Sequence, residues 1–328
     1  MIVGYIKEKN KSLKFLDRLK SIEITNYNNN YIISIYKNLN KENNKNMSKI
    51  IKIIIKLLKM YKIDTIVFSN EVTKEFKEEF SKNLIINKFN ITTLNGKRIM
   101  KYMDLEILNY IFEKQNIEKK NEEIYILIQQ NKNYNINYKS FLNELKEYIK
   151  KYIYIFKIVN LISNDIRELK NIQDEIMEKE NILISVSNNK RKALKRAKYI
   201  LNINLNESEL QKYTINRNAI IINLEQYIIF NKTSFNGINI NNIELDIPDD
   251  YIEQFEEIGE NFNYTVLYES IILNLNGEKS KNKVKERIKE DNIKIKYLIG
   301  NNGKISDVEL KQMVKNNIGI LDKKQKVV

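Results

Sequence analysis

The sequence predicts an α/β protein with two α/β domains and C-terminal helices. Strand-like apolar runs alternate with helical patterns along almost the whole chain, which is typical of layered α/β folds. The chain has 328 residues, and at roughly 150 residues per domain this length indicates two domains. Hydrophobic residues make up 42% of the chain, which is enough to build a core in each domain.

The first domain is predicted to cover residues 1–117. Its helices are recognised by apolar residues at helical spacing, as Ile50, Ile54 and Leu57 show for the first of them. The predicted strands are Ile2–Ile6, Tyr31–Tyr36, Thr65–Ser69 and Ile91–Leu94, and the predicted helices are Met47–Tyr61, Val72–Lys82 and Arg98–Lys114. The charged segment Glu118–Glu123 marks the first domain boundary.

The second domain is predicted to cover residues 118–247, where strands and helices alternate in short steps. The predicted strands are Ile124–Ile128, Ile153–Val159, Ile182–Ser187, Tyr199–Asn204 and Ala219–Leu224, and the helices are Tyr138–Lys151, Asp165–Lys179, Lys190–Lys198 and Glu207–Lys212. The run Ile-Leu-Ile-Ser-Val at 182–186 is nearly all apolar, as expected of a strand covered on both faces. We therefore expect a parallel sheet with right-handed crossovers.

The last segment, 248–328, begins at the only proline of the chain. Pro248 followed by Asp249 and Asp250 is a favourable helix start. We expect a helix over Tyr251–Ile258, or a longer broken helix that reaches Leu273. This helical segment is expected to pack back on the first domain.

Composition excludes several kinds of chemistry. The chain has no Cys, no His and no Trp. Thiolate and imidazole catalysis, disulfides, zinc fingers, haem and iron–sulfur ligation are therefore ruled out, and no metal site is predicted. Glycine is scarce as well, with 8 residues where an average chain of this length carries about 23.

The basic charge has two explanations. Ile, Asn and Lys supply 157 of the 328 residues, a bias that we attribute to an AT-rich bacterial genome. The net charge of +14 would otherwise suggest nucleic acid or an anionic membrane, yet only 7 of the 56 basic residues are Arg. The charge is uneven, since residues 1–100 hold 20 basic and 9 acidic residues. Nucleic acid is therefore kept as an alternative partner.

No secretory or membrane segment is expected. Charged residues follow Met1–Tyr5 at once, and no apolar run approaches the ~20 residues that span a bilayer. We expect a cytoplasmic protein without a membrane partner.

Two stretches of the second domain resemble a known family. Residues 197–204 (AKYILNIN) and 213–223 (YTINRNAIIIN) are similar to two strand segments of the NAD(P)-binding domain in dehydrogenases of the methylenetetrahydrofolate and shikimate dehydrogenase type. The resemblance covers about 70 of the 328 residues and rests on pattern. It implies a catalytic α/β domain first, a Rossmann-like and mostly parallel domain second, and C-terminal helices that return to the first domain.

The same resemblance implies a glycine-rich turn after the first Rossmann strand, where the pyrophosphate of a dinucleotide approaches bare backbone. We match Ile153–Val159 to that strand, and the following segment Asn160–Asp165 has no glycine. The alternative match, after strand Ile124–Ile128, is Gln129–Asn133, which also has none. We therefore predict a degenerate Rossmann-like domain that has lost dinucleotide binding, so that no cofactor is expected.

A nucleotide-like ligand, if one binds, would meet this turn and the turn after the next strand. The candidate residues are Asn160, Ser163, Asn164, Asn188, Lys190 and Arg191. In the resembling enzymes a basic residue at the second turn selects the 2′-phosphate of NADP. Residues 190–198 hold six basic residues and no acid, which also fits a short amphipathic helix with its bases in water.

Catalytic residues follow only from the resemblance. The shikimate dehydrogenase type uses a Lys and an Asp, and the matching candidates are Lys97, after the turn Asn95-Gly96, and Asp104 further along the predicted helix. Lys97 is better explained as a solvated lysine at a helix start.

Three functions are compatible with these observations. The first is a non-catalytic Rossmann-like binding or regulatory protein, whose partner is a protein or a nucleotide-like ligand. The second is an NADP-dependent oxidoreductase of the two-domain type that uses Lys97 and Asp104. The third is a basic nucleic-acid-binding protein, based on residues 1–100 and 190–198.

Overall fold

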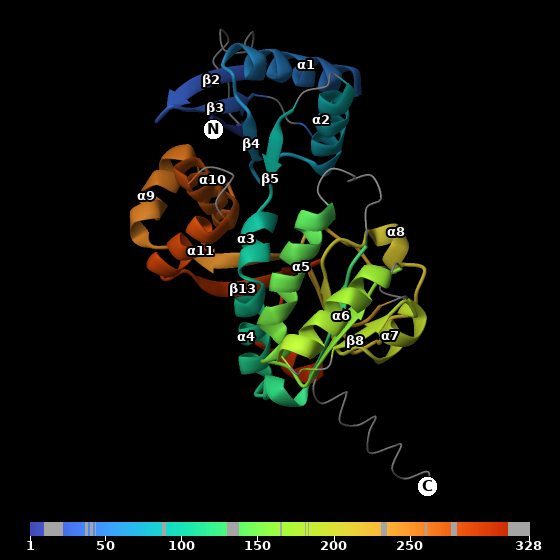
Figure 1. The fold of residues 1–328 in the computed structure, drawn as a ribbon. Coiled ribbons are helices and arrows are strands. Elements are labelled where there is room, and N and C mark those ends of the chain that lie inside the picture. The colour runs from blue at the N-terminus through green and yellow to red at the C-terminus, as the bar shows by residue number, and fades with distance from the viewer. Residues whose placement is uncertain are drawn as a thin grey trace. The chain divides into compact units, whose positions relative to one another are not determined.

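The structure, a computed structural model, divides into two compact units (Figure 1). Unit 1 comprises Met1–Ile99 and Glu244–Lys294, and unit 2 comprises Met100–Ile243 and Ile295–Val328. The structure describes residues 1–9, 22–36, 39, 42, 44–86, 90–129, 138–164, 166–180, 182, 184–230, 235–259, 261–276 and 281–313. Each unit is built from two separate chain segments. The domain boundaries predicted from the sequence, after residues 117 and 247, differ from the limits of these units.

Unit 1 contains a five-stranded sheet of order β2-β3-β1-β4-β5. Its strands are β1 (Val3–Glu8), β2 (Ile22–Tyr27), β3 (Asn30–Ile35), β4 (Thr65–Phe68) and β5 (Thr92–Leu94). The pairs β1–β3, β1–β4 and β4–β5 are parallel, and β2 pairs with β3 antiparallel. Four of these strands are predicted from the sequence. The edge strand β2 is not, because half of its residues are polar and none of them is buried.

The helices α1 (Asn44–Met60) and α2 (Lys74–Ile86) cover this sheet, as the sequence predicts. The apolar stripe of α1 is buried, since Ile50, Ile54 and Leu58 are 0–2% exposed. These residues share one cluster with Ile6 of β1 and Phe76 of α2. The helical periodicity of α1 is therefore explained by the sheet beneath it.

The second segment of unit 1 is helical. It forms α9 (Asp249–Ile258), α10 (Tyr264–Asn276) and α11 (Lys281–Glu290). The longer helix expected from residue 251 is broken at Gly259, whose φ of 138° ends α9. The hydroxyls of Tyr5 on β1 and Ser270 on α10 lie 3.1 Å apart and share a hydrogen bond, so α10 packs on this sheet.

Unit 2 contains a six-stranded sheet of order β11-β10-β9-β6-β7-β8, in which every pair is parallel. Its strands are β6 (Glu123–Leu127), β7 (Ile158–Ile162), β8 (Ser185–Ser187), β9 (Tyr199–Asn202), β10 (Ile220–Asn223) and β11 (Ile238–Ile240). With β6 counted as the first strand, the order from β8 is 3-2-1-4-5-6, the order of Rossmann folds. The predicted α/β fold class is therefore confirmed.

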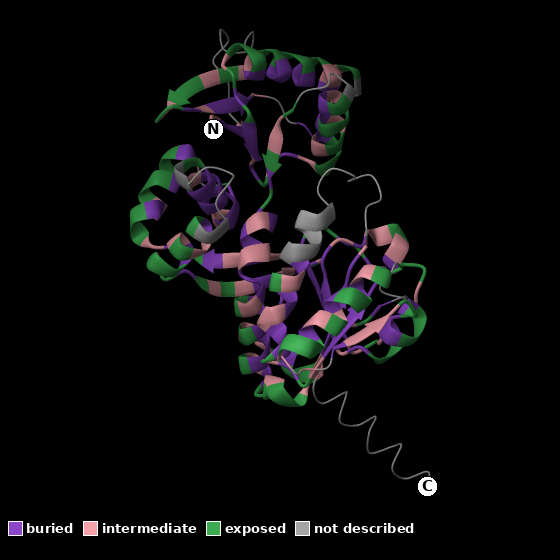
Figure 2. Cartoon of the chain, in the orientation of Figure 1, coloured by how far each residue is buried: buried purple, intermediate pink, exposed green. Residues whose placement is uncertain are grey.

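Strands β9 and β10 of unit 2 are buried at every position, and Figure 2 shows the strands inside this unit mostly in the colour of buried residues. The helices of this part of the chain are α3 (Lys97–Tyr102), α4 (Asp104–Gln115), α5 (Tyr138–Ile153), α6 (Arg167–Glu180), α7 (Lys190–Arg196) and α8 (Glu207–Leu210), with a short 3₁₀ helix at Lys119–Asn121. The remaining strands are β12 (Asn242–Asp246), β13 (Lys294–Gly300) and β14 (Gly303–Lys304), and β13 pairs with β14 as an antiparallel hairpin. The sequence predicts none of β11 to β14.

Two element predictions are wrong. Residues 153–159 do not form a strand, because α5 continues to Ile153 and β7 begins only at Ile158. The helix predicted over Arg98–Lys114 is interrupted at Met103, whose φ of −100° and ψ of 22° separate α3 from α4. No described helix is long and apolar enough to cross a membrane.

Candidate functional site

In open parallel sheets, ligands bind beyond the carboxyl ends of the strands, where the strand order reverses. In unit 2 this switch point lies between β6 and β9, which are neighbours. The side chain of Asn204, just after β9, accepts a hydrogen bond from the Gln129 N–H at 2.7 Å and donates one to the Gln129 carbonyl at 2.8 Å. Backbone groups that follow β6 are therefore already occupied by a side chain.

The sequence-based match to the first Rossmann strand is wrong. The strand at the switch point is β6, so residues 160–164 belong to the second strand, β7, and the residues just after it, while Asp165 lies outside the described part. Asn160 lies inside β7, where its side chain donates to Glu123 Oε2 at 3.3 Å. The turn after the first strand is the alternative match, Gln129–Asn133, of which residues 130–133 lie outside the described part. Glycine is absent from both segments.

The second group of candidates also lies one strand further along the sheet. Asn188, Lys190 and Arg191 follow the third strand, β8, rather than the second. The two groups are still brought together, because Ile162 pairs with Ser187 and the Ser163 N–H donates to the Ser187 carbonyl at 3.1 Å. Asn164, Asn188 and Arg191 are exposed, whereas Ser163 and Lys190 are buried.

Three buried side-chain atoms among the described residues have no hydrogen-bond partner: Ser69 Oγ, Ser163 Oγ and Lys190 Nζ. Each belongs to a residue just beyond the carboxyl end of a parallel strand. Ser69 follows β4, Ser163 follows β7, and Lys190 begins the helix after β8. A buried polar group without a partner costs about 1–3 kcal/mol, so such groups require an explanation. Their common position is the edge at which α/β sheets hold ligands.

Lys190 is the most unusual of the three, because its side chain is charged and only 2% exposed. Its Nζ lies 5.9 Å from the centre of the Tyr213 ring, at the distance of a cation–π contact. Burial lowers the pKa of Lys190, and the charge of Glu209 opposes this effect. Glu209 itself is bound to Lys212, whose Nζ lies 2.6 Å from its carboxylate. A second anion would therefore stabilise the protonated Lys190 amine.

A buried network of asparagines continues along the same edge, and the sequence analysis missed it. The Asn223 side chain, after Ile222 on β10, accepts a hydrogen bond from Asn202 at 2.9 Å and donates one to Asn239 at 2.7 Å. Asn301, after β13, accepts hydrogen bonds from Asn239 at 2.8 Å and Asn241 at 2.7 Å. These amides join the ends of β9, β10 and β11 to the β13–β14 hairpin. No single Asn of this set is distinctive in so Asn-rich a chain.

A hollow of about 440 Å³ adjoins this network. Among the described residues, its lining includes Phe230, Phe235, Asn239, Asn301 and Lys304. Asn239 and Asn301 are bonded to each other, so these two amides of the network shape one wall of the hollow.

Lys97 occupies the carboxyl edge of the unit 1 sheet, after β5. Glu269 on α10 holds the backbone on both sides of it, since its carboxylate accepts hydrogen bonds from the N–H groups of Gly96 at 2.7 Å and Arg98 at 2.9 Å. Lys97 is 8% exposed, and burial lowers its pKa to about 7. Burial likewise raises the pKa of Glu269. Lys97 is thus a buried amine on a fixed backbone, which corrects the interpretation as a solvated lysine.

Asp104 lies in unit 2, at the start of α4. Its carboxylate is buried, accepts a hydrogen bond from the Tyr152 hydroxyl at 2.5 Å and lies 3.4 Å from Lys151 Nζ. Burial and this carboxylate raise the pKa of Tyr152. Because Met103 interrupts the predicted helix, Asp104 begins a separate helix from the one that starts at Lys97. Through Tyr152 and Lys151, Asp104 connects α4 to α5.

The described residues contain no group of three acidic side chains that could hold a metal ion. No protein-family model matches the chain, and no curated protein matches it.

Solved structures show weak similarity to the chain. The L-tryptophan dehydrogenase from Nostoc punctiforme is 11% identical, with a TM-score of 0.28 over 88% of this chain and 87% of that one. A putative aspartate carbamoyltransferase from Trypanosoma cruzi is 10% identical, with a TM-score of 0.26 over 81% and 82% of the two chains. The anabolic ornithine carbamoyltransferase from Campylobacter jejuni is 12% identical, with a TM-score of 0.24 over 81% and 84%. Similarity at this level does not bear on function.

Proposed function

We propose that this protein binds a small anionic ligand, of the nucleotide-phosphate kind, at the carboxyl edge of the unit 2 sheet. The observation that carries the proposal is the buried amine of Lys190, which has no hydrogen-bond partner among the described residues. The Ser163 hydroxyl, also unpartnered, is one strand away at the same edge. An ammonium and a hydroxyl are the donors that a phosphate or carboxylate accepts from.

A binding role is favoured over hydride transfer by the turn after β6. The close approach of backbone to a pyrophosphate requires glycine, and residues 128–137 contain none. Asn204 also occupies both backbone groups of Gln129. The ligand is therefore held from the β7 and β8 side of the edge, and the usual dinucleotide position is not used.

The experiment is a thermal-shift titration with inorganic phosphate, ATP, NAD(H) and NADP(H) at low salt. The protein and K190M are compared, with K192M as a control because Lys192 is exposed on the same short helix. We expect a phosphate-bearing ligand to stabilise the protein and K192M, by about 2.7 kcal/mol at a hundredfold excess over Kd, but not K190M. Without ligand, K190M should melt at or above the temperature of the parent, because a buried unpaired charge is removed.

Two outcomes would overturn the proposal. One is the absence of any stabilisation at millimolar ligand. The other is a shift in K190M equal to that of the parent chain, which would place the ligand elsewhere.

The second candidate function is an NADP-dependent oxidoreductase. It is favoured by one observation, the buried Lys97 with its pKa lowered to about 7, because a proton-transfer group works best when its pKa lies near the working pH. A change in nicotinamide absorbance with hydroxy-acid or folate substrates, abolished in K97M, would establish it. NADP(H) binding without such turnover would support the binding role instead.

A further inference from the structure

The outer face of α1 carries a row of lysines that no other described helix matches. Five lysines recur at spacings of four, three, four and three residues: Lys45, Lys49, Lys52, Lys56 and Lys59. All five are exposed. At 3.6 residues per turn they fall within a sector of about 80°, and at 1.5 Å per residue the row is about 21 Å long.

Acidic residues are absent from this helix. Of the described helices with at least eight residues, α1 alone contains no Asp or Glu. Within the described part of the chain, Lys45, Lys49, Lys52 and Lys56 form no ion pair. Among the acids near this helix, Glu42 accepts a hydrogen bond from the Asn46 side chain at 2.8 Å. On α2, Glu78 pairs with Lys74 and Glu79 with Lys82.

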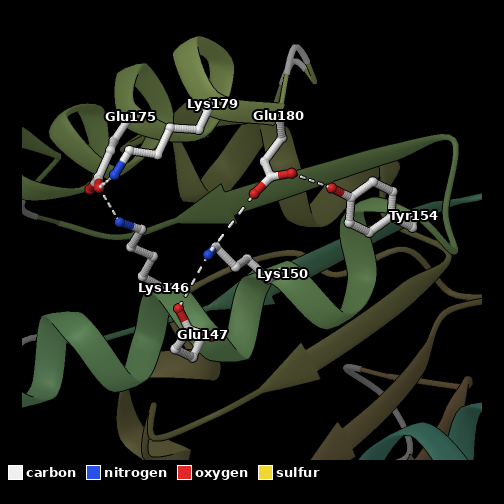
Figure 3. Close-up of polar contacts among 7 residues, drawn as sticks. All are labelled: Lys146, Glu147, Lys150, Tyr154, Glu175, Lys179 and Glu180. Atoms are coloured by element: carbon white, nitrogen blue, oxygen red, sulfur yellow. Dashed lines mark hydrogen bonds and ion pairs between the residues drawn. The ribbon is translucent and has the colours of Figure 1, made fainter.

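The helices α5 and α6 show the opposite arrangement (Figure 3). Lys146 and Lys179 both contact Glu175, and together they lower the pKa of its carboxyl to about 2. Lys150 lies 3.3 Å from Glu147 and 4.0 Å from Glu180. A genomic bias toward lysine applies to all of these helices, so it does not explain why one of them lacks carboxylates.

We propose that this lysine face of α1 docks the phosphate backbone of a nucleic-acid duplex, without base specificity. A straight row of positive charges about 21 Å long is complementary to one strand of regularly spaced phosphates. The face has no Arg, the residue that reads bases bidentately, so contact is restricted to the backbone.

An anionic membrane surface is the less favoured occupant. The apolar face of α1 is buried in the core of unit 1, and only Ile53 and Met60 expose large apolar side chains on this helix. An interfacial helix needs a whole apolar face to bury in lipid. The proposal concerns unit 1 alone and does not depend on the ligand proposed for unit 2.

The test is fluorescence anisotropy of a labelled, mixed-sequence DNA duplex, titrated with the full chain over a series of salt concentrations. If all five lysines contact phosphates, the slope of log K against log salt is about −4.5. In the double variant K49Q/K56Q the slope should become shallower by about 2, with weaker binding at every salt concentration. The control K150Q/K179Q removes the same charge from α5 and α6 and should keep the parent slope. Circular dichroism verifies that each variant is folded.

The absence of duplex binding at the lowest salt would overturn the proposal, as would equal slopes for the α1 variant and the control. Binding to vesicles of anionic phospholipid is measured in parallel. Binding to vesicles but not to the duplex, lost in K49Q/K56Q, would replace the proposal by a membrane surface. The K190M thermal shift is independent of all these outcomes.

Discussion

Lys97 shows how one buried amine couples the stability of this fold to pH. Its backbone is fixed, because Glu269 binds the N–H groups of Gly96 and Arg98 on either side. Burial lowers the pKa of Lys97 to about 7 from an ordinary value of 10.5. Protonation is therefore more favourable in the unfolded chain than in the folded one.

We expect the stability of the parent chain, relative to K97M, to rise as the pH increases from about 7 to about 10. In this window the unfolded lysine binds a proton and the folded one does not, so the slope is about 1.4 kcal/mol per pH unit. Below pH 7 both states are protonated and the full penalty applies. Urea unfolding at several pH values measures the difference. K82M, at an exposed site on α2, is the control, and parallel curves for the parent and K97M would contradict the expectation.

The sequence identifies some residues of the two edges and not others. Lys97, Ser163 and Lys190 follow from the family resemblance, which directs attention to the segments just after strands. Glu269 and Asn204 could not be found this way, because each acts on a backbone segment more than 70 residues away. Which distant segments lie side by side depends on the whole fold, so no local sequence pattern predicts it.

At the scale of elements, the end of α4 depends on a left-handed residue. Asn116 has φ 55° and ψ 48°, and its N–H donates to carbonyls of the last turn. This conformation costs most residues about 1–2 kcal/mol, whereas glycine adopts it freely.

We expect N116A to lower the free energy of unfolding by about 1 kcal/mol and N116G to leave it unchanged or slightly higher. Urea denaturation of both variants measures the difference. Asn109 is exposed in the middle of α4, so N109A serves as the control and should not destabilise the helix. Equal stability of N116A and N116G would show that the cap conformation is not what ends the helix.

Helices and strands are predicted correctly where the burial of their residues produces a regular pattern of apolar residues in the sequence. α1 is recognised by its apolar stripe, and β9 and β10 by runs that are buried at every position. The prediction failed at residues 153–159, because the end of α5 and the start of β7 are both apolar and merge into one run. The match to the Rossmann strands is displaced by one for a different reason: both strands are predicted, and no local pattern shows which of them lies at the switch point. The strand order, which only the structure shows, corrects it.

At the scale of the whole molecule, neither unit is a continuous piece of chain. The unit 1 sheet comes from residues 1–99, while α9, α10 and α11 come from residues 244–294. The later segment supplies Ser270, which binds Tyr5, and Glu269, which binds the backbone after β5. Unit 1 is therefore incomplete until the chain has returned from unit 2, although all five strands of its sheet come from the first segment.

We expect a fragment of residues 1–243 to lack a stable unit 1. Without α10, the apolar surface of β4 and β5 is left uncovered, and the Gly96 and Arg98 N–H groups lose their acceptor. The free energy lost in this way is expected to exceed the small net stability of a domain. Amide hydrogen exchange should show that β1, β4 and β5 lose protection in the fragment and regain it when residues 244–328 are added as a second chain. If residues 1–99 of the fragment are as protected as they are in the full chain, the first segment folds independently. The later segment would then add to unit 1 without being required for its folding.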